Sequence, residues 1–331
     1  MPSPSSELTV IAGCGYLGKV IARQLRAEGR AVLGLTHSEE SAAALGAEGI
    51  DAQACDLTDS EACRAVAGTA ACRAVAAAVG ALRLVHCAAS GRGGGPEQYR
   101  AVYLDGSRNL RTAFPEARFF FTSSTSVYNQ IDGGEITEDS PAEPDRETGR
   151  ILRLTEEEAL AAGGTVGRLA GIYGPGRSVL LKQFLEGRSV IDIRMEPPAT
   201  PDGRWINQIH VADAARAILH LLDLAEGAGG GSEGHHASRG ARLYNIADST
   251  PLLQRTLYSE LSTRFQRPLP PEAPPDVSRK RGWTHKQVRN ARLQATGWEP
   301  LYPDWFAALD HDPDFLSSIM NSQVAAAAAV S

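Results

Sequence analysis

The chain has 331 residues, long enough for a large buried core, and 43% of them are hydrophobic while 22% are charged. Its formal net charge of −6 argues against a nucleic-acid-binding or membrane-surface protein, because both classes favour a basic face. We find no run of about 18 uncharged apolar residues that would cross a membrane. The first seven residues lack the basic start and apolar core of a signal peptide. We therefore expect a cytoplasmic protein with no membrane and no nucleic-acid partner.

The chain alternates strand-like and helix-like segments. Apolar, β-rich runs predict strands at residues 8–13, 31–35, just before 55–56, and at 82–89, 118–124 and 164–172. Helical spacing and helix-favouring composition predict helices at residues 17–28, 39–46, 59–76, 97–113, 151–162 and 211–223. This alternation predicts an α/β fold, a Rossmann doubly wound parallel sheet with a smaller C-terminal α/β substrate domain.

We expect the Rossmann domain to span residues 8–172 and to receive strand and helix segments near 205–247. The substrate domain is expected at residues 173–204 and 248–315, followed by a tail at 316–331. Residues 225–241 are rich in glycine and include His235 and His236. We interpret them as a flexible surface insertion with solvated histidines.

Five cysteines lie in the first third of the chain. None of them forms a CxxC pair, and no histidine lies at metal-ligand spacing from them. We interpret them as buried, reduced thiols and expect no metal site.

A glycine loop connects the first strand to the first helix. Gly13, Gly15 and Gly18 stand in the context where a GxGxxG pattern indicates dinucleotide binding. The first glycine permits a tight turn, the second lets the backbone approach a pyrophosphate, and the third lets the helix pack on the strand. Tyr16 and Leu17 would offer N–H groups at the helix N-terminus. A purely structural turn is the alternative, but the surrounding strand–helix units favour a nicotinamide dinucleotide.

The end of the second strand carries the cofactor preference. An NAD site would place an acidic residue there for the ribose hydroxyls, but the sequence has Thr36, His37 and Ser38. These side chains can donate hydrogen bonds to a 2′-phosphate, so we favour NADP(H) over NAD(H), although no arginine lies in the stretch. After the third strand come Asp56 and Leu57. Asp56 is expected either to accept from the adenine amine or to cap the following helix.

Several segments together resemble the extended short-chain dehydrogenase/reductase superfamily, from residue 10 to about residue 309. They are the glycine loop, Val-His-Cys-Ala-Ala at 85–89, Thr-Ser-Ser-Thr-Ser-Val-Tyr at 122–128, Arg-Leu-Ala-Gly-Ile-Tyr-Gly-Pro at 168–175, Asn-Gln-Ile-His-Val-Ala-Asp at 207–213, Tyr-Asn-Ile-Ala-Asp at 244–248 and Gly-Trp-Glu-Pro-Leu-Tyr-Pro at 297–303. The resemblance implies an NAD(P) domain and a smaller substrate domain, often one acting on nucleotide-sugars. It also implies cofactor contacts from Ala88, Ala89, Ser123 and Ile172.

The catalytic residues depart from the superfamily pattern of serine, tyrosine and lysine, with an asparagine from the preceding helix. Ser124 matches the serine. Gly149 and Arg153 stand where the tyrosine and lysine of Tyr-x-x-x-Lys would be, and Asp105 stands at the asparagine position. Ala12 also replaces the first glycine of the extended GxxGxxG pattern. This combination resembles atypical members of the epimerase/dehydratase type, a subgroup without one settled reaction.

Without that tyrosine, a reduced carbonyl oxygen needs another source for its proton. Ser124 can polarise a carbonyl but is a weak acid, and Arg153 can hold the nicotinamide ribose or an oxyanion but is a poor proton shuttle. Tyr128 is one candidate donor, its alternative being to shape the site. Asp105 is another if it is buried, its alternative being a backbone bond at a helix kink.

Substrate contacts are expected in loops at the carboxyl ends of the strands. Ser126, Arg177, Arg204 and Asn207 lie there. Tyr173 is expected beside the nicotinamide, and its alternative is to take part in the chemistry as a third substitute for the missing tyrosine. The arginines suit a phosphate or carboxylate, or they are solvated surface residues. The resulting hypothesis is an NADP-dependent oxidoreductase or epimerase/dehydratase-like enzyme for a small polar substrate, with a non-standard proton donor. The alternative is a catalytically silent NADP(H)-binding sensor. Homodimers are frequent in the family that the chain resembles.

Overall fold

The computed structural model describes residues 7–76, 82–91, 94–227, 242–276 and 283–328. They divide into two compact units. Unit 1 comprises Met1–Val127, Pro144–Arg168 and Ala215–Tyr244, and unit 2 comprises Tyr128–Glu143, Leu169–Ala214 and Asn245–Ser331, so far as these ranges are described. Residues 228–241 of the expected insertion lie outside the described residues. The domain boundaries expected from the sequence stay a prediction.

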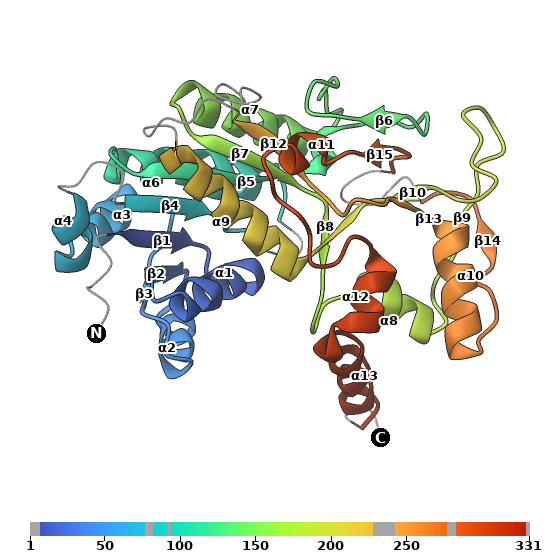
Figure 1. Ribbon diagram of the computed structural model, residues 1–331. Coiled ribbons are helices and arrows are strands. Elements are labelled where there is room, and N and C mark those ends of the chain that lie inside the picture. Colours follow the sequence, from blue (N-terminus) through green and yellow to red (C-terminus); the bar gives the residue numbers. More distant parts are fainter. Residues whose placement is uncertain (1–6, 77–81, 92–93, 228–241, 277–282, 329–331) are drawn as a thin grey trace. The chain divides into compact units, whose positions relative to one another are not determined.

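Unit 1 is built on a seven-stranded sheet, counted over the described residues, with the order β12-β7-β5-β4-β1-β2-β3 (Figure 1). The strands are β1 (Leu8–Ala12), β2 (Ala31–Thr36), β3 (Ala52–Ala54), β4 (Leu82–His86), β5 (Arg118–Ser124), β7 (Thr165–Leu169) and β12 (Leu243–Ile246). β1 pairs in parallel with both β2 and β4. The strand order reverses between β1 and β4, which is the doubly wound Rossmann topology that we predicted. Ligands of such sheets bind at this switch point, outside the carboxyl ends of the strands.

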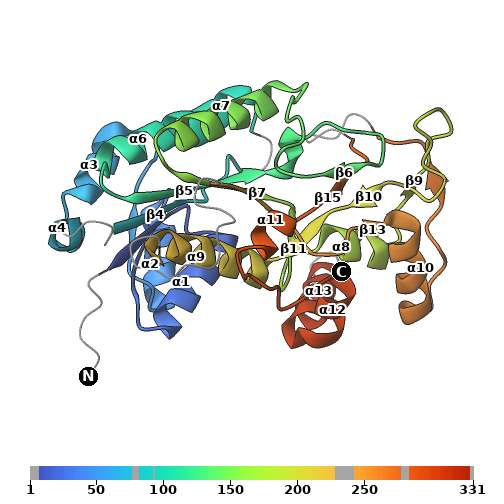
Figure 2. The same cartoon turned by 45° about the horizontal axis from the view of Figure 1, so that its top comes forward.

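Helices cover both faces of this sheet, so its strands are nearly continuous apolar runs; all five residues of β1 are buried. The helices are α1 (Tyr16–Ala27), α2 (Glu39–Ala47), α3 (Ser60–Ala67), α4 (Ala70–Ala76), α5 (Pro96–Tyr99), α6 (Gly106–Ala113), α7 (Glu147–Ala161) and α9 (Val211–Gly227), with a π-helical segment η1 (Arg100–Asp105) and a 3₁₀ turn η2 (Thr125–Val127). Figures 1 and 2 show α1 and α2 on one face of the sheet and α6 and α7 on the other.

Some expected elements differ in detail. The helix expected at 59–76 is two helices, because α3 ends at Ala67 with Gly68 as its C-cap and α4 begins at Ala70. The helix expected at 97–113 is present, but its middle is the π-helical segment η1. The strand expected at 164–172 is two strands, because the chain changes partners between them. Ala170 N donates to Ile246 O, whereas Gly171 N donates to Asn207 O. The second strand, β8 (Gly171–Tyr173), therefore pairs with β11 (Gln208–His210) outside the large sheet.

Unit 2 consists of two-stranded sheets and helices around its own apolar core. Besides β8 and β11, its elements are β6 (Glu135–Ile136) with β15 (Gln287–Val288), β9 (Ile191–Asp192) with β14 (Glu272–Ala273), β10 (Trp205–Ile206) with β13 (Leu252–Leu253), α8 (Val179–Leu185), α10 (Gln254–Phe265), α11 (Ala291–Gln294), α12 (Trp305–His311) and α13 (Pro313–Ala328). The expected tail is largely helix α13. Among the described residues, no helix is long and apolar enough to cross a membrane.

Candidate functional site

The glycine loop lies at the switch point of unit 1, and two of its glycines are required by packing. Gly13 has φ +93°, and a Cβ built on it would lie 2.3 Å from the Cα of Ala88, which follows β4. A Cβ on Gly18 would lie 2.7 Å from the carbonyl oxygen of Gly13. Real Cβ atoms do not approach backbone this closely. Glycine at these positions therefore allows β1, β4 and α1 to meet.

Gly15 differs from the other two glycines, because a Cβ built on it meets nothing within 4 Å. It is the N-cap of α1 and supplies no side-chain cap, and the first N–H groups of a helix lack acceptors within the helix. The open space beside the Gly15 Cα lies at the positive end of the helix dipole, and both features suit a diphosphate. The end of the glycine loop, where Gly15 leads into Tyr16 and Leu17 of α1, thus fits a dinucleotide.

The three residues expected to select NADP are mostly occupied by other contacts. The Thr36 hydroxyl donates to Ser38 O at 3.0 Å. Ser38 caps α2, because its hydroxyl accepts from Ser41 N at 3.2 Å and donates to the Ser41 hydroxyl at 3.0 Å. The His37 side chain is 84% exposed, and its Nδ1 lies 4.0 Å from an Asp56 carboxylate oxygen. The Asp56 carboxylate beside His37 would repel a 2′-phosphate, which counts against a preference for NADP(H).

Asp56 and Leu57 form the turn after β3. Asp56 Oδ1 accepts from the backbone N–H and the hydroxyl of Thr58, and the backbone N–H bond lowers the pKa of the carboxyl. The alternative that Asp56 caps the next helix is wrong, because Asp59 caps α3 by accepting from Glu61 N. The second carboxylate oxygen of Asp56 faces His37.

The serines at the end of β5 have different environments. Ser124 is half-buried, and its hydroxyl oxygen accepts from Ser126 N at 3.2 Å, which leaves the hydroxyl hydrogen available for donation. Ser126 is half-buried in the turn η2. Ser123 is buried, and its hydroxyl donates to Glu156 Oε1 at 2.5 Å. The hydroxyl expected to contact the cofactor is therefore bound by protein.

Helix α7 contributes to a buried ion cluster at the place where the superfamily pattern has its tyrosine and lysine. Glu156 is fully buried and receives two bonds from Arg168, at 3.0 and 2.7 Å. Arg153, at the lysine position, donates to Glu156 at 2.5 Å and to Glu157 at 3.1 Å. We therefore correct its assignment to the ribose or an oxyanion, because two carboxylates already hold its guanidinium. A Cβ on Gly149, at the tyrosine position, would lie 2.4 Å from Pro144 Cβ.

Neither Tyr128 nor Asp105 has the surroundings that a proton donor would need here. Tyr128 is fully buried in unit 2, and its hydroxyl lies 2.9 Å from Asn245 Oδ1 and 3.1 Å from Thr137 O. We correct its catalytic assignment, since it has no exposed surface through which to reach a substrate. Asp105 is 44% exposed and lies 3.4 Å from Arg108. Its carboxylate is therefore not buried, which was the condition for a catalytic role, and it pairs with Arg108 instead.

Tyr173 and Asn207 are structural residues of unit 2. Tyr173 is 1% exposed, packs against the rings of Trp305 and Phe315, and has its pKa raised by burial. Asn207 donates from Nδ2 to Lys286 O at 2.9 Å and accepts at Oδ1 from Val288 N at 2.7 Å. Both were expected to contact substrate or nicotinamide. We correct these assignments, because one side chain is in the core and the other holds a neighbouring backbone.

The remaining predicted residues keep some exposed surface. Arg204 is 24% exposed, and its Nε donates to the buried Asp192 at 3.0 Å. Arg177 is exposed in the turn after β8, Ile172 is half-buried in β8, and Ala89 is exposed after β4.

Lys286 is a buried residue that the sequence analysis missed. It is 3% exposed, its Nζ donates to the backbone carbonyl of Tyr128, and it lies 5.6 Å from the centre of that tyrosine ring. Burial, with a smaller effect of Arg204, lowers the pKa of Lys286 to about 7. No sequence signal marks a single lysine in a polar turn as buried.

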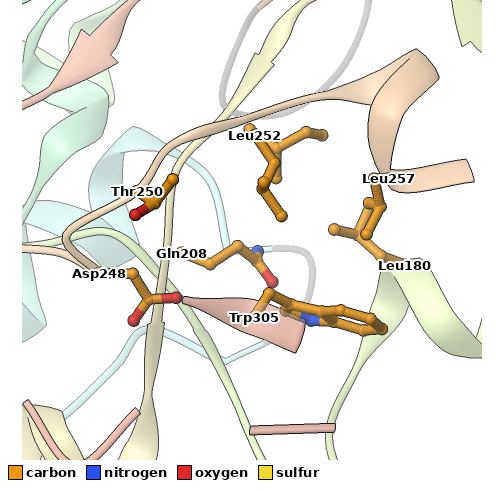
Figure 3. A pocket seen from close by; sticks show the side chains of 8 residues that line it. Leu180, Gln208, Asp248, Thr250, Leu252, Leu257 and Trp305 are labelled. Atoms are coloured by element: carbon orange, nitrogen blue, oxygen red, sulfur yellow. The ribbon is translucent and has the colours of Figure 1, made fainter. Parts of the chain in front are cut away.

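Unit 2 contains a small pocket lined by polar and apolar side chains. Figure 3 shows its polar side chains, Gln208, Asp248 and Thr250, with apolar side chains of Leu180, Leu252, Leu257 and Trp305. Ile206 also lines this pocket. Burial raises the pKa of Asp248. The pocket has room for about one water molecule, so we do not assign the substrate to it.

Comparison with known proteins agrees with this fold and loop. A family model described as the NAD dependent epimerase/dehydratase family matches residues 9–234. Protein YeeZ of Escherichia coli K12 is 27% identical over 307 residues, which cover 89% of this chain and 96% of that protein.

Solved structures are similar over almost the whole chain. A candidate NAD-dependent epimerase/dehydratase from Methylobacillus flagellatus has a TM-score of 0.67 at 27% identity, covering 96% of this chain and 100% of that one. The UDP-glucose 4-epimerase of Thermus thermophilus, in complex with NAD, has a TM-score of 0.67 at 19% identity, covering 95% and 99%. The chain belongs to the NAD dependent epimerase/dehydratase family, which confirms the resemblance seen in the sequence.

Proposed function

We propose that the chain binds a nicotinamide dinucleotide at its glycine loop and acts as an epimerase/dehydratase-like enzyme on a small polar substrate. The observation that carries this proposal is the contrast within the loop. Gly13 and Gly18 are required by packing, whereas a side chain on Gly15, the N-cap of α1, would meet nothing within 4 Å of its Cβ. Packing within the chain gives no reason for a glycine there, but close approach of a diphosphate does.

In this proposal the bound dinucleotide supplies or takes up a hydride at a substrate carbon. Ser124 donates its hydroxyl hydrogen to the substrate oxygen and polarises it; this serine lies at the end of β5 and is half-buried. Neither Gly149 nor Arg153 moves a proton, because one has no side chain and the other is held by Glu156 and Glu157. We infer that water or a hydroxyl of the substrate carries the proton. Loss of a protein acid costs about 10²–10⁴-fold in rate, so slow turnover is expected.

Binding of NADH and NADPH, followed by calorimetry, tests the cofactor assignment. Gly15→Asp places a carboxylate in the open space, and we expect at least about tenfold weaker binding of both cofactors from repulsion of the phosphates. Gly46→Asp is the matched control, because Gly46 also has open space around it but lies near the end of α2. An intact fold with no cofactor uptake by the unmodified protein would contradict the proposal.

We also propose that the chain prefers NADP(H) to NAD(H). Because Thr36 and Ser38 are bound within the protein, this preference depends on His37. We expect NADPH to bind more tightly than NADH by about twofold to tenfold, the range for one added hydrogen bond from the His37 ring to the 2′-phosphate. His37→Ala should remove that difference, whereas His311→Ala, an exposed histidine of unit 2, should not. Equal affinities in the unmodified protein would end the NADP assignment.

One observation favours a second candidate, a dinucleotide-binding sensor without catalysis. Neither the tyrosine nor the lysine position carries a group that could move a proton. A side chain at Gly149 would collide with Pro144, and Arg153 is bound to Glu156. The two candidates separate when the protein with bound NADP⁺ or NAD⁺ is mixed with nucleotide-sugars such as UDP-glucose and with simple carbonyl and hydroxy compounds. Appearance of absorbance from reduced nicotinamide, or conversion of the sugar, supports the enzyme. Binding without either supports the sensor.

A further inference from the structure

Two cysteines of unit 1 lie in contact at the turn that follows β3. The Sγ atoms of Cys55 and Cys63 are 3.9 Å apart, and Cys63 Sγ also lies 3.9 Å from the carbonyl oxygen of Leu57. Cys55 directly follows β3 and Cys63 is in the first turns of α3. The two residues thus bracket the turn that contains Asp56 and Leu57. Both side chains are more than nine-tenths buried.

The other described thiols have different surroundings. Burial raises the pKa of Cys14 to about 11 and also raises that of Cys87, so these thiols are poor nucleophiles. The hydrogen bond between the two thiols lowers the pKa of Cys55 and, with burial, raises the pKa of Cys63. Cys55 is therefore the thiol of this pair that more readily becomes a thiolate, and its partner sulfur is already in contact.

We propose that Cys55 and Cys63 are a redox-active dithiol that hydrogen peroxide converts to a disulfide. Peroxide transfers an oxygen atom to Cys55 Sγ; the S–O bond forms, the O–O bond breaks, and water leaves. Cys63 Sγ then attacks Cys55 Sγ, which forms the S–S bond, breaks the S–O bond and releases a second water. Two electrons pass from the two thiols to the peroxide. A thiol reductant reverses the reaction by exchange.

Disulfide formation has a cost at the turn between the two cysteines. The Sγ–Sγ distance must fall from 3.9 Å to about 2.05 Å, while hydrogen bonds hold the turn between the two cysteines. Asn109 Nδ2 donates to Leu57 O at 2.9 Å, and Asp56 holds Thr58 at the same turn. The closure therefore strains the segment 56–59 beside His37, where the proposed function places the adenosine of the cofactor.

Mass spectrometry tests the disulfide directly on the full chain. Trypsin cuts after Arg30 and Arg64, and the peptide 31–64 contains Cys55 and Cys63 and no other cysteine. After peroxide treatment we expect this peptide to lose two hydrogen atoms and to regain them with dithiothreitol. The Cys72→Ser variant, which changes another buried cysteine, should behave the same, whereas Cys63→Ser should not. A peptide 31–64 that stays reduced while other cysteines oxidise overturns the proposal.

Cofactor affinity gives the second readout, and this part depends on the proposed function. We expect the disulfide form to bind its dinucleotide about fivefold or more weakly, and bound dinucleotide to slow formation of the disulfide, because coupling between two binding or modification equilibria is reciprocal. If the disulfide forms and the affinity for the dinucleotide stays unchanged, the claim that it strains the turn at residues 56–59 is refuted. If the reduced protein binds no dinucleotide, the proposed function fails, but the mass of peptide 31–64 still decides whether the dithiol reacts.

Discussion

Replacement of Glu156 by alanine tests the claim that α7 holds a structural ion cluster in place of catalytic residues. Glu156 is fully buried and accepts hydrogen bonds from Ser123, Arg153 and Arg168. Its removal leaves Arg168, which is 1% exposed, without this carboxylate. Breaking one side of a buried ion pair costs about 3–5 kcal/mol, because the remaining charge is uncompensated.

The matched control is Glu157→Ala, one residue further along the same helix. Glu157 is 60% exposed and bonds to Arg153 at 3.1 Å, so its loss should cost no more than about 1 kcal/mol. Glu156→Gln separates the contribution of the charge from that of side-chain packing, since glutamine keeps the shape of glutamate and removes its charge. We expect its destabilisation to lie between those of the two alanine variants.

Urea unfolding followed by far-UV circular dichroism is the suitable assay. The four tryptophans, at positions 205, 283, 298 and 305, belong to unit 2, so their fluorescence does not report directly on the cluster. Equal midpoints and slopes for Glu156→Ala and Glu157→Ala would refute the reasoning, since the buried carboxylate would then carry no more stability than the exposed one.

Three further perturbations test other parts of the structure. Lys286→Met should change the pH dependence of stability. Burial lowers the pKa of Lys286 in the folded protein to about 7, below its ordinary value of 10.5, so the unfolded state binds more protons between these pH values. The unmodified protein should therefore gain stability as pH rises from 7 toward 10. Urea midpoints measured across that range should lose this slope in Lys286→Met and keep it in Lys182→Met, a more exposed lysine. Gly149→Ala should lower thermal stability through contact with Pro144, whereas Gly46→Ala in the open part of α2 should raise it by up to about 1 kcal/mol; thermal melts with the opposite order would contradict the packing argument. Ser124→Ala should lower turnover of an identified substrate at least about tenfold, and an unchanged rate would make Ser124 a structural serine only.

The Rossmann sheet, the glycine loop and the absence of a Tyr-x-x-x-Lys pair were all predictable from the sequence. Each depends on neighbouring residues: strand and helix periodicity, the glycines that allow a tight turn, and the residue types at one helix start. The Ser38 cap of α2 could also have been predicted, because Ser38 precedes a helix that opens with Glu39 and Glu40.

The roles of Tyr128 and Asn207 were decided only by the tertiary structure. The hydroxyl of Tyr128 bonds to Asn245, 117 residues away, and the amide of Asn207 bonds to the backbone of Lys286, 79 residues away. The sequence alone shows that such side chains can form hydrogen bonds, but not which distant donor or acceptor folding brings to them. Their burial, and therefore their loss as site residues, follows from long-range packing that local sequence patterns do not encode.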